Sequence, residues 1–101
     1  MDYTFDKYQG AGNDFILIDA RSRSFKSMNQ FQINSICKRN FGIGSDGLIL
    51  IKDHKKLDFE MIYYNSDGLK SSMCGNGARC AVAYAYERNV CSREASFMTY
   101  D

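Results

Sequence analysis

Apolar residues along this chain fall into short runs separated by turns that contain glycine, asparagine and aspartate. Residues 14–19 and 48–52 are dense apolar runs that predict buried strands, and residues 59–65 alternate as in a half-exposed strand. Weaker patterns at residues 3–8 and 95–99 predict two further strands. Strand runs outnumber helical ones, which is compatible with an α/β (α+β) domain, although an open sandwich would also fit the lengths.

Two segments have the pattern of helices. Residues 78–88 contain no glycine or proline, are rich in alanine and are apolar or amphipathic on all sides, which predicts a helix packed on most of its surface. Residues 29–37 predict a short amphipathic helix. Asn29 and Gln32 have the spacing of a capping box there, and basic residues followed by Gly42 supply the end.

The composition is that of an ordinary globular domain. A length of 101 residues is enough for one domain with a core, and 45% hydrophobic and 25% charged residues are typical values. The net charge of +1, with both signs interspersed, indicates neither a nucleic-acid partner nor a membrane surface. The first residues lack the features of a signal peptide, and no run approaches transmembrane length, so we expect a cytoplasmic protein.

The chain contains four cysteines, which raise the questions of disulfides and of metal binding. Without a signal peptide, Cys37, Cys74, Cys80 and Cys91 are expected to be reduced thiols. Their spacing does not match paired zinc ligands, and His54 stands alone in a charged stretch that predicts a solvated loop, so we expect no metal site. Cys37 lies on the apolar face of its helix and is expected to fill the core, whereas Cys91 in a polar connection is expected to be structural or incidental.

Cys74 is the residue with the clearest candidate chemistry, because it directly precedes a turn of Gly75, Asn76 and Gly77, and the turn directly precedes the helix at 78–88. The free N–H groups and the dipole at a helix N-terminus attract anions and lower the pKa of a nearby thiol. Glycines let the backbone approach a ligand closely. The loop therefore combines a thiolate with a cradle for an oxyanion, although cysteine is also common as a small packing residue.

Two asparagines, Asn13 and Asn65, lie at turns. Either the backbone preferences of turns or ligand binding can explain why asparagine occurs at these positions. Asn13 lies in the turn at residues 10–14, at the root of the following strand, and its amide can both donate hydrogen bonds to a zwitterionic ligand and accept them. Asn65 ends a strand and opens a type I turn over residues 65–68. If residues 69–73 return as a short strand, Asn65 and Cys74 meet at one rim.

Residues 42–47 lack a nucleotide-binding fingerprint and predict a tight turn.

Four motifs in order resemble the diaminopimelate epimerase family: residues 10–15 (Gly-Ala-Gly-Asn-Asp-Phe), 42–47 (Gly-Ile-Gly-Ser-Asp-Gly), 64–68 (Tyr-Asn-Ser-Asp-Gly) and 73–80 (Met-Cys-Gly-Asn-Gly-Ala-Arg-Cys). The resemblance covers nearly all of the chain. It implies a mixed or mainly antiparallel sheet wrapped around the helix at 78–88. Some members place a side-chain amide at the position of Gly47, and glycine has no side chain with which to make such a ligand contact.

The resemblance also implies a reaction and the residues that carry it. The reaction is the epimerisation of LL-diaminopimelate to the meso form, without a cofactor, in the pathway to lysine and peptidoglycan precursors. Cys74 is implied as one of two acid–base thiols, with Asn13 and Asn65 binding the amino-acid substrate. The N–H groups near Gly75 and Asn76 are suited to its α-carboxylate.

The family is about twice this length or more and takes its second catalytic cysteine from a similar C-terminal half. An ending just after a strand begins indicates a truncation, so we expect the isolated chain to bind weakly and not to turn over; a homodimer is compatible with this reading. Three alternatives stay open: a racemase of another amino acid, a non-catalytic ligand-binding module, and a redox sensor in which Cys74 and Cys80 form a bridge.

Overall fold

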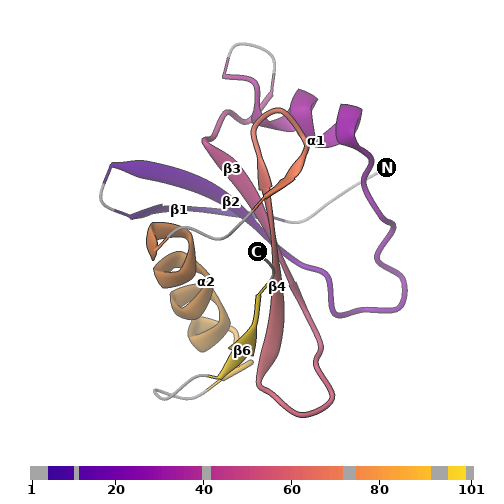
Figure 1. Ribbon diagram of the computed structural model, residues 1–101, viewed down its shortest axis with the longest axis vertical. Coiled ribbons are helices and arrows are strands. Elements are labelled where there is room, and N and C mark those ends of the chain that lie inside the picture. The colour runs from indigo at the N-terminus through magenta and orange to yellow at the C-terminus, as the bar shows by residue number, and fades with distance from the viewer. Residues whose placement is uncertain (1–4, 11, 40–41, 72–74, 92–95, 100–101) are drawn as a thin grey trace.

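The computed structural model describes residues 5–10, 12–39, 42–71, 75–91 and 96–99. Within these ranges the chain forms a six-stranded sheet and two helices (Figure 1). The elements in chain order are β1 (Asp6–Gly10), β2 (Asn13–Asp19), α1 (Gln30–Cys37), β3 (Gly47–Lys52), β4 (Phe59–Asn65), β5 (Lys70–Ser71), α2 (Gly75–Glu87) and β6 (Phe97–Met98).

The sheet is mixed, as the resemblance implied. Its strands are ordered β1-β2-β3-β4-β5. The short strand β6 pairs with the beginning of β4, on the same side of β4 as β5. The pairs β1–β2, β3–β4 and β4–β5 are antiparallel, whereas β2–β3 and β4–β6 are parallel. Parallel neighbours need a crossover connection, and α1 lies in the segment that joins β2 to β3. The starts of β2 and β3 therefore lie at the same edge of the sheet.

The central strands β2 and β3 are buried on both faces, because a helix packs on each side of the sheet (Figure 1). Side chains alternate between the faces of a strand. Phe15 and Leu17 accordingly belong to the core on the α2 side, whereas Ile16 and Ile18 belong to the core on the α1 side. Strands β1 to β4 and β6 all contribute side chains to the α2 side, so one face of this helix packs against five strands of the sheet.

Helix α1 has the predicted capping box at its start, but its end is formed differently from the prediction: Lys38 is the C-cap, no basic residue lies in the last turn, and the glycine with positive φ is Gly44 and not Gly42. The Asn29 side chain accepts a hydrogen bond from the Gln32 N–H at 2.8 Å, and the Gln32 side chain accepts one from the Asn29 N–H at 2.9 Å. At the other end, the N–H of Gly44 donates to the carbonyl oxygen of Ile36 at 3.1 Å. Gly44 has φ +82°, a conformation that glycine adopts without strain. The glycine-rich segment is thus a tight turn that closes the helix.

Helix α2 differs from its prediction in two respects. It begins at Gly75 instead of residue 78, so Gly75 to Gly77 form its first turn and not a separate turn before it. The destabilising effect of glycine, an entropic cost of roughly 0.5–1 kcal/mol, applies to the middle of a helix and not to its first residues. The helix is also less enclosed than its composition predicted. Tyr86 is 48% exposed and Ala83 is exposed, whereas Tyr84 and Ala85 on the opposite face are buried.

The shorter strands differ from their predictions mainly at the ends. β1 is predicted over residues 3–8 but runs from Asp6 to Gly10, and residues 1–4 lie outside the described part of the chain. β5 and β6 have two residues each, inside the predicted ranges 69–73 and 95–99. Cys37 is 3% exposed and fills the core as expected. Neither α1, with eight residues, nor α2, with thirteen, has the length that a helix needs to cross a bilayer.

We expect Gly47→Ala to destabilise the fold, because a Cβ atom at this position would lie 2.7 Å from the backbone oxygen of Tyr64 and 2.6 Å from the Tyr63 ring. Overpacking of this kind typically costs about 1–3 kcal/mol. Gly75→Ala is the matched control, since a Cβ there would meet nothing within 4 Å. Urea unfolding of both variants measures the difference. Equal midpoints would show that β3 and β4 do not need the glycine.

Candidate functional site

Three of the candidate positions lie at one edge of the sheet, namely the edge that is formed by the ends of the strands. Asn13 is the first residue of β2, Gly47 is the first of β3 and Asn65 is the last of β4. Gly47 pairs with Asn65 in the antiparallel ladder and with Phe15 in the parallel one. Because neighbouring strands are about 4.8 Å apart, the backbones of β2 and β4 are separated by about 10 Å at this edge.

Asn13 and Asn65 also share a face of the sheet. Asn13 has the same side-chain direction as Phe15, because residues two apart in a strand point the same way. Asn65 is related in the same manner to Met61, and both Phe15 and Met61 belong to the core around α2. Both asparagines are partly exposed and lie on the α2 side of the sheet.

The first turn of α2 reaches the same edge. The Asn76 Nδ2 donates a hydrogen bond to the Asn13 Oδ1 at 2.9 Å, which joins residues 63 positions apart in the chain. Figure 1 shows the start of α2 next to the β1–β2 hairpin. Gly75 is exposed, and a Cβ there would meet no atom within 4 Å apart from its chain neighbours and the nearby helix backbone. The first-turn backbone is therefore open to close approach by a ligand.

The structure thus brings some of the predicted site residues together, whereas one of them lies outside the described part of the chain. Asn13 and Asn76 are in contact, Asn65 lies on the same edge and face, and Gly75 lies beside them at the start of α2. Cys74 lies outside the described residues, as do residues 72 and 73. It is bonded to Gly75, the first residue of α2. The redox-sensor alternative, with a disulfide bridge between Cys74 and Cys80, therefore depends on a residue outside the described part of the chain.

The turn that carries Asn65 is braced by α1. The Gly68 N–H donates to the Asn65 carbonyl oxygen at 2.9 Å and closes the predicted turn. From α1, the Asn34 Nδ2 donates to the Ser66 carbonyl oxygen at 3.0 Å, and the Gln30 Nε2 donates to the Asp67 carbonyl oxygen at 3.3 Å. Helix and turn are more than thirty residues apart in the sequence, and these contacts fix the end of β4 from outside the sheet.

Position 47 has no room for the side-chain amide that some members of the resembled family carry there. A Cβ at Gly47 would lie 2.8 Å from the hydroxyl oxygen of Tyr63. The Tyr63 ring also makes an edge contact with Phe15, with 5.9 Å between centroids. An aromatic side chain of β4 therefore fills the space above Gly47.

A cluster of four charged residues next to Asn13 was not found by sequence reasoning. The Arg39 guanidinium donates to both carboxylate oxygens of Asp14, at 2.9 and 3.1 Å, and to Asp46 at 3.0 Å. Lys7 Nζ lies 3.1 Å from Asp14 Oδ2. Two carboxylates and two cations make the cluster neutral as a whole. The available signal was the presence of an aspartate in each of the first two motifs, at positions 14 and 46.

Asp14 is the electrostatic centre of this cluster, with only 11% of its side chain exposed. Hydrogen bonds from Arg39 hold its pKa well below the usual range, assisted by Lys7 and by the Asp46 N–H, while burial acts in the opposite direction. The same pairing raises the pKa of Arg39. Asp14 is thus an ionised structural anchor at the root of β2.

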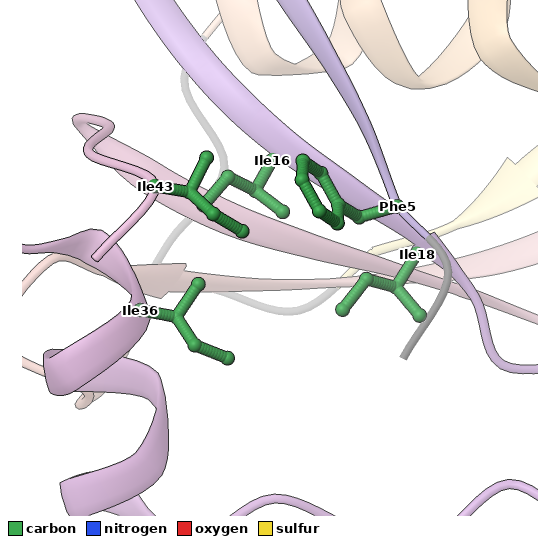
Figure 2. Close-up of a pocket in the computed structure, with 5 residues that line it drawn as sticks. All are labelled: Phe5, Ile16, Ile18, Ile36 and Ile43. Atoms are coloured by element: carbon green, nitrogen blue, oxygen red, sulfur yellow. The ribbon is translucent and has the colours of Figure 1, made fainter. Parts of the chain in front are cut away.

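The chain also has an apolar pocket of about 190 Å³ between β2 and α1. Figure 2 shows that its lining is aliphatic and aromatic; the residues are Phe5, Ile16, Ile18, Ile36 and Ile43. Ile16 and Ile18 point away from the face that carries Asn13 and Asn65. The side chains that line this pocket are all apolar and offer no polar group to a zwitterion, and the pocket is separate from the candidate site.

Comparison with known proteins gives a family match over nearly the whole chain. The family model described as diaminopimelate epimerase matches residues 5–99. The diaminopimelate epimerase of Flavobacterium psychrophilum is 52% identical over 95 residues, covering 94% of this chain and 37% of the relative. That of Prochlorococcus marinus is 48% identical over 95 residues, covering 88% and 33%. That of Aquifex aeolicus is 42% identical over 104 residues, covering 94% and 37%. The chain spans about a third of the length of these relatives.

Two solved structures share the fold at low sequence identity. A PhzF-family phenazine biosynthesis protein of Bacillus anthracis has a TM-score of 0.62 and 15% identity, over 96% of this chain and 31% of its own. Methylitaconate-delta-isomerase has a TM-score of 0.65 and 13% identity, over 90% and 49%. At these identities the likeness concerns the fold alone.

We expect Arg39→Met to reduce stability at neutral pH and to flatten its loss in acid. The lowered pKa of Asp14 means that its ion pairs stabilise the fold above about pH 4, the ordinary value of the group, and that this contribution is lost as the pH falls through the lowered value. Urea midpoints between pH 2 and 7 measure the effect. Arg23→Met is the control, because Arg23 is exposed and has no ion pair among the described residues. Identical pH profiles for Arg39→Met and the wild type would contradict the assignment.

Proposed function

The chain belongs to the diaminopimelate epimerase family, and on this basis we propose that it supplies one half of an active site that epimerises LL-diaminopimelate to meso-diaminopimelate. The observation that carries the proposal is the contact between Asn76 and Asn13, because it unites two separate family motifs at one edge. Asn65 lies on that edge and face. The relatives are about three times as long as the matched segment, so the activity of the whole protein is inferred from them.

Inversion of an α-carbon requires removal of a proton from one face and delivery of a proton to the opposite face. We assign the first role to the Cys74 thiolate, which takes the α-proton and becomes a thiol. A second thiol, on the other side of the substrate, donates its own proton to the carbon. The roles exchange in the reverse direction, and no cofactor is needed for the proton balance.

An α-proton of an amino acid is a weak acid, so the site has to stabilise the negative charge that develops on proton removal. The N–H groups of the first turn of α2, at Gly75 and Asn76, are suited to hold the α-carboxylate. The same helix terminus lowers the pKa of a thiol beside it. The open space at Gly75 supports this role, because a carboxylate must approach the backbone to within hydrogen-bond distance.

The amides of Asn13 and Asn65 supply the polar contacts of the proposed site. Each amide can donate and accept, which suits the ammonium and carboxylate groups of a zwitterion. We assign the second thiol and the contacts to the distal amino-acid centre to a C-terminal half, as the resemblance implies; the greater length of the relatives leaves room for such a half.

We expect Cys74 to react with iodoacetamide at neutral pH faster than an ordinary thiol and to be protected by diaminopimelate. The physical reason is a larger thiolate fraction at a helix N-terminus and a shared binding site. Peptide mass mapping measures alkylation at each cysteine with and without the amino acid.

Cys91 is the internal control for this measurement. It is partly exposed, and burial raises its pKa, so it should react slowly whether or not the ligand is present. Cys37 is buried and should be inert, since burial raises its pKa as well. A Cys74 that reacts no faster than Cys91 would favour a non-catalytic packing role.

We further expect the 101-residue chain to bind diaminopimelate weakly and not to interconvert its stereoisomers, because a single thiol acts on one face only. Chiral chromatography after incubation with LL-diaminopimelate measures conversion, and ligand-induced NMR shifts measure binding. Formation of the meso isomer by the purified chain, absent from Cys74→Ala, would show that the second half is unnecessary.

A further inference from the structure

We propose that Asp46 is a positioning residue that sets the orientation of two side-chain amides in series, those of Asn13 and Asn76. Asp46 belongs to the motif at residues 42–47, which the proposed function leaves without a chemical role. Its effect on the site passes through Asn13, so Asp46 need not touch a ligand. The part of the proposal that concerns an amino-acid ligand rests on the proposed function.

The first step follows from the hydrogen-bonding capacity of a carboxylate. An ionised carboxylate accepts hydrogen bonds and has none to donate, whereas an amide has an accepting oxygen at one end and a donating nitrogen at the other. Asp46 Oδ2 lies 3.2 Å from Asn13 Nδ2. The amide of Asn13 must therefore turn its nitrogen towards Asp46, because its oxygen would meet an electron-rich acceptor there.

The second step carries this polarity to α2. With its nitrogen towards Asp46, Asn13 presents its Oδ1 to Asn76 at 2.9 Å. An amide oxygen only accepts, so Asn76 has to donate from its Nδ2. The orientation of Asn76 is thereby decided by a carboxylate that acts on it through Asn13. Asp46, Asn13 and Asn76 form a relay of three polar groups.

Asp46 itself is held from several directions, so its carboxylate is a fixed reference. Its Oδ2 also accepts from the backbone N–H of Asp14 at 3.0 Å, and its Oδ1 accepts from Arg39 at 3.0 Å. Its own backbone N–H donates to the Asp14 carbonyl oxygen at 3.0 Å. Charge-assisted hydrogen bonds of this type are stronger than neutral ones. The carboxylate can accordingly dictate the orientation of a neutral amide.

The relay decides which atoms remain for a ligand. With respect to the described residues, Asn13 keeps one N–H, since its nitrogen has two and Asp46 takes one. Asn76 has used an N–H towards Asn13 and, in the same part of the chain, keeps its oxygen as an acceptor. The two amides thus offer a defined donor and a defined acceptor next to the open backbone at Gly75. This pairing fits the carboxylate and ammonium groups of an α-amino acid.

The test compares the side-chain amide resonances of Asn13 and Asn76 in Asp46→Ala and in the wild-type chain by ¹H–¹⁵N NMR. We expect both pairs of resonances to move in Asp46→Ala. Asp53→Ala is the matched control, because Asp53 is exposed and hydrogen-bonds no described residue, and it should move neither. Asn76 resonances that stay in place in a folded Asp46→Ala chain would overturn the proposal. Should Asp46→Ala not fold, Asp46→Asn keeps the volume and is expected to move the same resonances.

A double variant separates the relay from a direct electrostatic effect. In an Asn13→Ala chain the relay is cut, so adding Asp46→Ala should cause no further change at the Asn76 amide. A further change as large as that in the wild-type background would mean that Asp46 acts on Asn76 through space, which would overturn the serial arrangement.

Titration with meso-diaminopimelate adds the functional readout. We expect Asp46→Ala to weaken binding about tenfold, equivalent to about 1.4 kcal/mol, and Asp53→Ala to leave it unchanged. Unchanged affinity in Asp46→Ala, with the resonances moved, would overturn the role of the relay in ligand binding. A wild-type chain that binds no diaminopimelate would instead contradict the proposed function, while the NMR comparison would still decide the relay.

Discussion

The carboxylate of Asp46 is the contact on which the candidate site depends. It joins the loop before β3 to the beginning of β2, through hydrogen bonds to the Asp14 backbone and the Asn13 side chain. One short side chain can do this because β2 and β3 are parallel neighbours and begin at the same edge. Arg39, which follows α1, bridges Asp14 and Asp46 and ties the crossover connection to the same point. The cluster therefore fixes the place from which Asn13 meets α2.

Steric packing matters at this edge as much as charge does. Two glycines there have opposite surroundings. Gly47 is surrounded, since Tyr63 and the backbone of Tyr64 occupy the region that a side chain would need. Gly75 is open, and the first turn of α2 is accessible from outside. The first glycine serves the packing of β3 against β4, whereas the second leaves room for a ligand. The same residue type in two motifs thus has two physical explanations.

The proposed chemistry accounts for the one-sided arrangement of the polar groups. Asn13, Asn65 and the start of α2 lie on one face of one sheet. Such a surface can approach a substrate from one side, whereas inversion needs acid–base groups on both sides of the carbon. A second unit opposite the first is the simplest way to meet this requirement. The length of the relatives, about three times the matched segment, is consistent with such a division.

The linear order of residues determined most of the secondary structure and the identity of the candidate residues. The capping box at Asn29, the buried strands and the turn after Asn65 depend on interactions between near neighbours, so local patterns predict them. Local patterns failed at the start of α2, where glycines that read as a turn are the first turn of the helix. They also failed for its solvent-exposed face, because burial depends on which strands reach the helix.

Only the tertiary structure decided which polar groups meet. The contact between Asn13 and Asn76, and the charged cluster around Asp14, join residues from separate strands and helices. Their partners are set by the parallel pairing of β2 with β3 and by the position of α2, and both depend on packing between distant segments. A sequence shows which side chains are able to donate or accept a hydrogen bond. The choice of partner, and with it the orientation of each amide, depends on the folded arrangement of the sheet edge.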